Sequence, residues 1–260
     1  MFENVNGLLV RPTASPFAWT AHHGNGSMWD AKPAAADLDG DGYAEVLVGG
    51  AAGGLTLLVY VSGSTSGNAS GTPYAYALGS LSSICEDAFA PPRSTGGAAP
   101  ALFDVSGDGL VELLLGGQQG GLLYAPNMGT PTDTQLAAPP LASVGRSPGG
   151  GCSSPASADL DGDGDGDVIV GGCDGTLLLL WNTGGEAVRN IPIVPRLYET
   201  HSGNSSATAV VALADLAVGP THPALADLDG DGDYDLLVGA ADGELHYLEN
   251  VGDATTPRCT

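Results

Sequence analysis

A nine-residue acidic loop occurs four times in this chain and constrains its fold more than any other feature. The clearest copy, residues 227–235, has carboxylates at its first, third, fifth and ninth positions. A short apolar run ending in glycine follows each copy, as at residues 236–239. The residues at these four positions are Asp37, Asp39, Asp41 and Glu45 in loop 1, Asp104, Ser106, Asp108 and Glu112 in loop 2, Asp159, Asp161, Asp163 and Asp167 in loop 3, and Asp227, Asp229, Asp231 and Asp235 in loop 4. The chain is therefore expected to consist of four similar units.

The composition of these loops predicts calcium binding. Alternate residues of a tight loop can turn their oxygen atoms toward one centre, and the intervening glycines allow backbone angles that side chains disfavour. Ca²⁺ takes about six to eight oxygen ligands, including backbone carbonyls. The seventh positions, whose carbonyls can complete the shell, are Tyr43, Leu110, Asp165 and Asp233. We expect up to four Ca²⁺ ions, with the weakest binding in loop 2, where Ser106 replaces an acid.

Other calcium motifs fit the pattern less well. An EF-hand loop has its final acid later in the loop and lies between helices. Here the residues after the final acid are Leu, Val and Ile, which favour strands. Thrombospondin-type calcium repeats are shorter and richer in cysteine. The acidic loops are therefore expected to join β-strands.

The unit Pro-Ala-Leu-Ala-Asp-Leu-Asp-Gly-Asp-Gly-Asp-Tyr-Asp-Leu-Leu-Val-Gly at residues 223–239, with Asp-Gly-Glu-Leu-His-Tyr-Leu-Glu-Asn at 242–250, resembles an FG-GAP/VCBS repeat. This family includes the calcium-binding blades of the integrin α-chain propeller and many secreted propellers. The resemblance extends over all four repeats. It implies an all-β fold, a β-propeller of four FG-GAP/VCBS-type blades with calcium-binding hairpin loops, either closed or a section of a larger propeller. It implies no particular ligand, because the family serves many roles.

The repeats predict a single propeller domain over residues 1–260. Its repeats are expected at about 22–80, 96–140, 152–200 and 220–260, with residues 1–21 completing the last blade. That closure is suggested by residues 2–5, Phe-Glu-Asn-Val, which match Leu-Glu-Asn-Val at 248–251. The alternative is a section of a longer chain cut within a blade at both ends. Outer strands are expected at 74–77 and 191–197, a long Pro/Gly-rich connection at 131–151, and a short helix or extra strand at 210–213.

The charge of the chain limits its partners. The formal net charge is −23, with 30 acidic residues against 7 basic ones. Binding to nucleic acid or to anionic lipid is disfavoured on electrostatic grounds. No run approaches the roughly 18 apolar residues of a membrane-spanning helix, so direct membrane insertion is not expected.

Several features predict a secreted or cell-surface location. Cys152 and Cys173 lie almost symmetrically about loop 3, so an antiparallel hairpin would bring them together as a disulfide. Cys85 and Cys259 can form a second bridge, or Cys259 can pair outside the chain. Asn-x-Ser sequons, which are acceptors for N-glycosylation in secreted proteins, begin at Asn25, Asn68 and Asn204. Loops of this kind also need extracellular calcium concentrations to be filled.

No catalytic motif is present, so no catalytic residue and no enzymatic activity are predicted. The leading hypothesis is a structural or adhesive module that docks onto other protein chains of an extracellular assembly. The alternative is a calcium-dependent lectin that binds glycans between blades. Lectin propellers usually repeat an aromatic residue at each site, whereas Trp19, Trp29 and Trp181 do not fall at equivalent positions. A non-catalytic domain of a larger secreted enzyme is the remaining alternative.

Overall fold

A computed structural model describes residues 3–5, 8–10, 31–50, 54–62, 74–78, 97–118, 120–137, 142–146, 151–182, 193–196, 210–212, 219–252 and 257. These residues form strands β1 to β18 and contain no helix. Within the same ranges there is accordingly no helix with the length and apolar character to cross a membrane.

Most strands belong to four antiparallel sheets in which consecutive strands are neighbours. Sheet 1 contains β3 (Lys32–Ala36), β4 (Glu45–Gly49), β5 (Leu55–Ser62) and β6 (Tyr74–Leu78). Sheet 2 contains β7 (Ala99–Phe103), β8 (Glu112–Gly116), β9 (Gly121–Ala125) and β10 (Ala142–Arg146). Sheet 3 contains β11 (Ser153–Ala158), β12 (Asp167–Gly172), β13 (Thr176–Asn182) and β14 (Ile193–Arg196), and β15 (Val210–Ala212) also pairs with β13. Sheet 4 contains β16 (Thr221–Ala226), β17 (Asp235–Ala240) and β18 (Leu245–Leu248).

The local sequence explains why the second strand of each sheet is central. Residues 113–115 and 168–170 are runs of Leu, Val and Ile, and every residue of β8 and β12 is buried. A strand buried on both faces is expected to be apolar throughout, without the polar alternation of a half-exposed strand. The acidic loop turns the chain into this strand, as where Ala226 pairs with Asp235 across loop 4.

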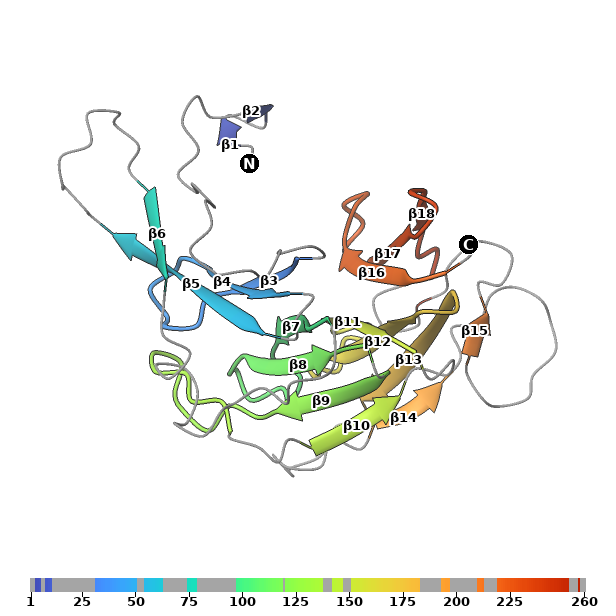
Figure 1. Cartoon of the computed structure of the whole chain (residues 1–260), viewed down its shortest axis with the longest axis horizontal. Helices are drawn as coiled ribbons and strands as arrows, with labels where there is room; N and C mark the ends of the chain where they lie inside the picture. Colours follow the sequence, from blue (N-terminus) through green and yellow to red (C-terminus); the bar gives the residue numbers. More distant parts are fainter. Residues whose placement is uncertain are drawn as a thin grey trace.

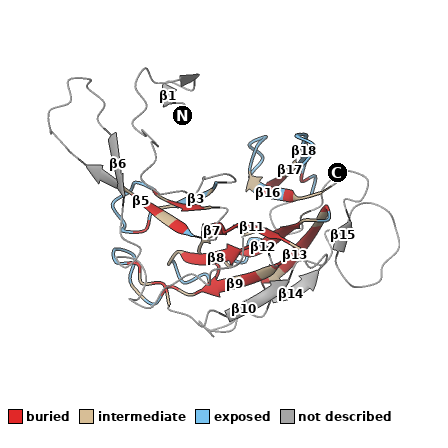
Figure 2. Ribbon diagram, viewed as in Figure 1, coloured by how far each residue is buried: buried red, intermediate tan, exposed pale blue. Residues whose placement is uncertain are grey.

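The four sheets pack face to face in chain order. Strand β3 contacts β7, β7 contacts β11, and β11 contacts β16, so the first strands lie side by side (Figure 1). A separate apolar core fills each of the three spaces between consecutive sheets, and most of the buried residues lie there (Figure 2). The three cores include the following residues: Leu47, Leu57 and Leu113 between sheets 1 and 2; Leu114, Tyr124 and Val168 between sheets 2 and 3; and Ile169, Leu179 and Leu236 between sheets 3 and 4.

The outer strands agree with most expectations. The predicted strand at 74–77 is β6, the one at 191–197 contains β14, and residues 210–212 form a strand, not a helix. The Pro/Gly-rich connection expected at 131–151 contains a strand that the sequence did not indicate, because β10 lies within it and pairs with β9. Its apolar alternation is short, and the register shifts between Ser143 and Gly145. Pairing with the edge of β9 supplies the stability that the local sequence does not indicate.

The N-terminal prediction is not decided by the described residues. Strands β1 (Glu3–Val5) and β2 (Leu8–Val10) pair with each other. The completion of the last blade by residues 1–21, and the single-domain boundaries, remain predictions. Cys85, Cys259 and the sequons at Asn25, Asn68 and Asn204 lie outside the described residues.

Candidate metal sites

Each acidic loop joins the first two strands of one sheet, and its first aspartate folds it back on itself. In loop 4, the Asp227 carboxylate accepts hydrogen bonds from the backbone N–H of Gly230 at 2.7 Å and of Gly232 at 3.2 Å. Both glycines have positive φ, 81° and 98°, which explains why glycine stands at these two positions. The first aspartates of the other loops make the same pair of bonds: Asp37, Asp104 and Asp159.

The third and fifth positions each bond to the backbone two residues later. In loop 4 the Asp231 N–H donates to Oδ1 of Asp229, and the Asp233 N–H donates to Oδ1 of Asp231, both at 3.2 Å. Loops 1 and 3 repeat both bonds. These turns orient successive carboxylates without helix or strand geometry.

The ninth position is buried and fastens the start of the loop to the second strand. Its side chains, Glu45, Glu112, Asp167 and Asp235, are at most 2% exposed. Each accepts the backbone N–H of the second loop residue, at 2.7–3.0 Å. Burial raises the pKa of the Glu112 and Asp167 carboxyls to about 7, against the lowering effect of these hydrogen bonds. A buried carboxylate in this position gains from a nearby cation.

The loops bring carboxylate oxygens together, although not every predicted residue joins a group. In each loop, three acids place one ligand atom within 4.8 Å of one another: Asp37, Asp39 and Asp41; Asp104, Asp108 and Glu112; Asp159, Asp161 and Asp167; and Asp227, Asp229 and Asp231. Glu45, Asp163 and Asp235 lie outside these triads. In loop 2 the Ser106 hydroxyl donates to Oε1 of Glu112 at 3.0 Å.

These donors fit a hard cation. The grouped atoms of the four loops are all carboxylate oxygens, which suit Ca²⁺ and lack the nitrogen or sulfur ligands typical of zinc sites. In loop 4, Oδ1 of Asp233 is buried and has no hydrogen-bond partner among the described residues. Burial, with the neighbouring Asp231 carboxylate, raises the pKa of Asp233 to about 6. Burial and Asp163 likewise raise the pKa of Asp161.

A buried asparagine that the loop pattern did not single out connects the loops to the ends of the third strands. The Asn182 N–H donates to Oδ1 of Asp167 at 2.7 Å, and its Nδ2 donates to the carbonyl of Val105 in loop 2 at 2.5 Å. Asn127 Nδ2 donates to the Val111 carbonyl, also in loop 2, at 3.1 Å. The sequence carries a signal for these residues, since asparagine stands eleven residues after glycines 116, 171 and 239, which lie at or next to the ends of the second strands.

A further acidic group lies in the turn between β17 and β18. Asp242, Glu244 and His246 can bring ligand atoms within 4.8 Å of one another. The Asp242 carboxylate accepts the Glu244 N–H at 3.0 Å, as Asp174 accepts the Thr176 N–H in the turn of sheet 3. This hydrogen bond, which shapes the turn, explains the presence of Asp242 without a metal ion.

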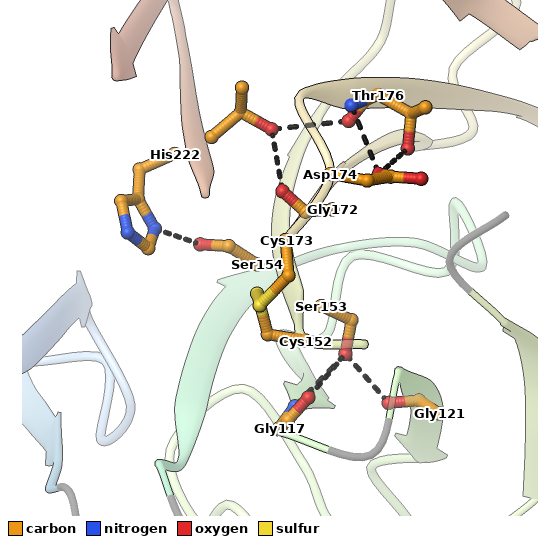
Figure 3. Close-up of a disulfide and its surroundings, with 11 residues drawn as sticks. Gly117, Gly121, Cys152, Ser153, Ser154, Gly172, Cys173, Asp174, Thr176 and His222 are labelled. Carbon is orange, nitrogen blue, oxygen red and sulfur yellow. Dashed lines mark hydrogen bonds between the residues drawn. A yellow bond between two sulfur atoms is a disulfide. The ribbon is translucent and has the colours of Figure 1, made fainter. Parts of the chain in front are cut away.

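The predicted disulfide is confirmed. Cys152 and Cys173 are bonded, with Cα atoms 5.0 Å apart, where β11 and the β12–β13 turn meet (Figure 3). The neighbouring pair, Ser153 and Gly172, is the end of the β11–β12 ladder. The bridge therefore closes the strand pair that carries loop 3.

The sheets and loops together define an all-β protein of repeated antiparallel units with acidic hairpin loops. A family model described as "FG-GAP-like repeat" matches residues 104–170 and 159–238, which together span more than half of the chain. The chain belongs to this family of FG-GAP-like repeats. No curated protein matches it. The repeats fit a protein-interaction module.

Proposed function

We propose that the protein is a calcium-stabilised extracellular β-propeller module that binds other protein chains in an adhesive or structural assembly. The observation that carries the proposal is the fourfold acidic loop with one hydrogen-bonding scheme and three converging carboxylates in each copy. The face-to-face order of the four sheets supports the propeller arrangement, with each sheet as one blade.

Calcium would be held by the converging acids of each loop, with Ser106 in loop 2 and the seventh-position carbonyls as further oxygen donors. The ion would offset the repulsion among these carboxylates and join the two strands that the loop connects. Each site then stabilises the fold by mass action, about 2.7 kcal/mol at a free concentration roughly 100 times the dissociation constant. Loops held rigid in this way would lose less conformational entropy when another protein binds to them.

Three features support an extracellular location. The disulfide between Cys152 and Cys173 suits an oxidising compartment. Extracellular modules commonly bind calcium at about 0.1–1 mM, a concentration found outside cells. The sequons at Asn25, Asn68 and Asn204 are consistent with that location.

Glycan binding, the alternative to protein docking, has less support from the described residues. Trp181, the tryptophan within the described ranges, packs partly buried against the core between sheets 3 and 4. An aromatic residue engaged in the core is poorly placed to stack on a sugar. The described part of the chain therefore offers the lectin alternative no repeated tryptophan platform.

The test is calcium-dependent stability, followed by partner binding. Thermal unfolding would be measured with chelator, with about 1 mM CaCl₂ and with about 1 mM MgCl₂. We expect calcium to raise the melting temperature by several degrees and magnesium to raise it much less. Asp229→Asn should remove one site by calorimetric titration, whereas the matched variant Asp242→Asn, in an acidic turn outside the loops, should remove none. Equal melting temperatures in all three buffers would refute the calcium role.

A second measurement separates the protein-docking hypothesis from the lectin alternative. A glycan array would be probed in calcium and in chelator. The proposal expects a blank array from a protein that calcium stabilises. Specific glycan binding that disappears with chelator would replace the docking function with a lectin function.

A further inference from the structure

The contact between consecutive sheets is built in the same way three times. A glycine at or next to the end of the second strand of one sheet lies directly against the start of the first strand of the next. A Cβ atom added to this glycine would lie 2.2–2.4 Å from a backbone carbonyl oxygen of that strand, so only glycine fits. The three pairs are Gly49 with Ala98, Gly116 with Ser153, and Gly171 with Thr221. We call each such contact a sheet junction.

Hydrogen bonds fix the sheet junctions. The Ser153 N–H donates to the Gly117 carbonyl at 2.8 Å. The Ser153 hydroxyl donates to the Gly121 carbonyl at 2.8 Å, as Figure 3 shows. The Ala98 N–H bonds to the Gly50 carbonyl in the same way, at 3.0 Å.

At the third junction the Thr221 hydroxyl lies within hydrogen-bond distance of two carbonyls, those of Gly172 at 3.2 Å and Thr176 at 3.1 Å. Each junction therefore attaches the start of one sheet to the turn of the sheet before it.

Each sheet junction has two halves: a receiving half, formed by the glycine and the third strand of one sheet, and an inserting half, formed by the start of the next sheet's first strand. In sheet 4, no described residue lies against the receiving half. A Cβ added to Gly239 would meet only the carbonyl of its own sheet's His222, at 3.8 Å. Leu245 is 68% exposed, whereas its equivalents Leu55, Leu122 and Leu177 are at most 9% exposed. Tyr247 is 46% exposed, and its equivalents are 1–4% exposed: Leu57, Tyr124 and Leu179. An apolar face that is buried in three sheets is thus open in the fourth.

Sheet 1 presents the matching inserting half. Ala31 and Pro33 are exposed. Their equivalents in the three junctions are all buried: Ala98 and Pro100, Ser153 and Pro155, and Thr221 and Pro223. A comparable contact between β3 and β16 is absent among the described strands. One chain therefore carries both complementary halves of an interface that it forms three times internally.

We propose that copies of this chain associate head to tail, with β3 of one copy docked on the open face of sheet 4 of another. By equivalence with the internal junctions, Ala31 would lie against Gly239 and its N–H would reach the Ala240 carbonyl. The contact uses two different surfaces, and such heterologous contacts form rings when the rotation closes. The smallest assembly of separate copies that covers both halves is a closed pair.

Charge acts against this association and sets the conditions of its test. Each copy has a net charge of −23, so two copies repel one another at low ionic strength. At about 0.15 M salt the screening length is about 8 Å, and the repulsion is confined to close groups. The apolar junction then dominates, and we expect association to strengthen from low salt to about 0.15 M with calcium present.

The experiment is sedimentation velocity of the purified chain at a series of concentrations. We expect a species of twice the chain mass. Gly239→Ala, which adds one methyl group to the receiving half, and Pro33→Asp, which alters the inserting half, should each raise the dissociation constant tenfold or more. The control Met128→Asp changes another exposed residue (49%), one that belongs to neither half, and should leave the dissociation constant unchanged.

Mixing the two variants distinguishes two possibilities. Either β3 of another copy covers the open face of sheet 4, or a segment of the same chain covers it. Gly239→Ala retains an intact inserting half and Pro33→Asp an intact receiving half, so the mixture should recover association through one junction. Monomeric wild-type protein at all concentrations would overturn the proposal. So would a Gly239→Ala variant that remains as associated as the wild type.

Discussion

The carboxylate of Asp167 is bonded to the backbone of Asn182, fifteen residues later, through a hydrogen bond of 2.7 Å between Asn182 N and Oδ1. Its other oxygen accepts the Leu160 N–H at 3.0 Å. Sheet 4 repeats the arrangement, where Asp235 Oδ1 accepts the Asn250 N–H at 2.8 Å. The last acid of the loop therefore connects the loop to the end of the third strand, in addition to any part it takes in holding an ion.

The first prediction separates these two roles in loop 3. Asp167→Ala should lower the free energy of unfolding by about 2–4 kcal/mol with or without calcium, because it leaves two backbone N–H groups without their acceptor. Asp161→Ala should lower it only when calcium is present, since the hydrogen bond that Asp161 accepts from the Asp163 N–H, at 3.3 Å, is exposed to solvent. Urea unfolding of both variants in calcium and in chelator measures the difference. Equal losses from the two variants in chelator would contradict this division.

The second prediction concerns the weaker loop. The Ser106 hydroxyl bonds to Oε1 of Glu112 and supplies no charge, so loop 2 should bind calcium less tightly than loops 1, 3 and 4. Ser106→Asp would supply a fourth carboxylate and should tighten binding at loop 2 by about tenfold. Calorimetric titration of this variant and of the wild type measures the change, with Gln118→Glu, which adds a carboxylate at an exposed position outside the four loops, as the control. A titration of the wild type in which loop 2 fills first would disprove the ranking.

The third prediction is a pH dependence of the calcium-free protein. Burial raises the pKa of Glu112 and Asp167 to about 7, from ordinary values of 4.5 and 3.8. Between about pH 4 and 7 the folded state therefore keeps protons that the unfolded state has released, and rising pH favours unfolding. The stabilisation is complete below the unfolded pKa values and is lost as the pH passes 7.

Calcium should reverse this trend, because it binds the ionised carboxylates and its affinity rises with pH. Urea midpoints at about pH 5, 6, 7 and 8, in chelator and in calcium, test both statements. We expect the two curves to diverge as the pH rises. A chelated protein that became more stable between pH 5 and 7 would contradict the assignment of Glu112 and Asp167 as the dominant titrating groups.

Much of the fold and of the candidate sites was predictable because the loops are locally determined. The first aspartate and its two bonded glycines form the same turn in all four loops, and the Leu-Leu-Val run after Asp235, followed by a glycine, favours a strand. The pairing of Cys152 with Cys173 followed from symmetry about the same hairpin. These features depend on residues close in sequence, which is why the pattern was sufficient to find them.

Other features depend on neighbours distant in sequence and were not predictable in the same way. Strand β10 exists because β9 offers it an edge, although residues 142–146 read locally as part of a loop. The bond from Asn182 to the Val105 carbonyl joins residues 77 positions apart. The openness of Gly239 is likewise a property of packing, since its sequence context matches that of Gly171.

The last prediction uses that contrast. Gly171→Ala should lower the free energy of unfolding by about 1–3 kcal/mol, because the added Cβ would lie 2.2 Å from the Thr221 carbonyl oxygen and force sheets 3 and 4 apart. Gly239→Ala occupies the equivalent position, where the nearest atom of another residue is 3.8 Å away. In dilute protein, below the concentration at which copies associate, it should change the free energy by less than about 0.5 kcal/mol. Thermal unfolding should show a loss of about 2–9 °C for the first variant. A comparable loss for Gly239→Ala in dilute solution would mean that another part of the same chain already lies against this glycine.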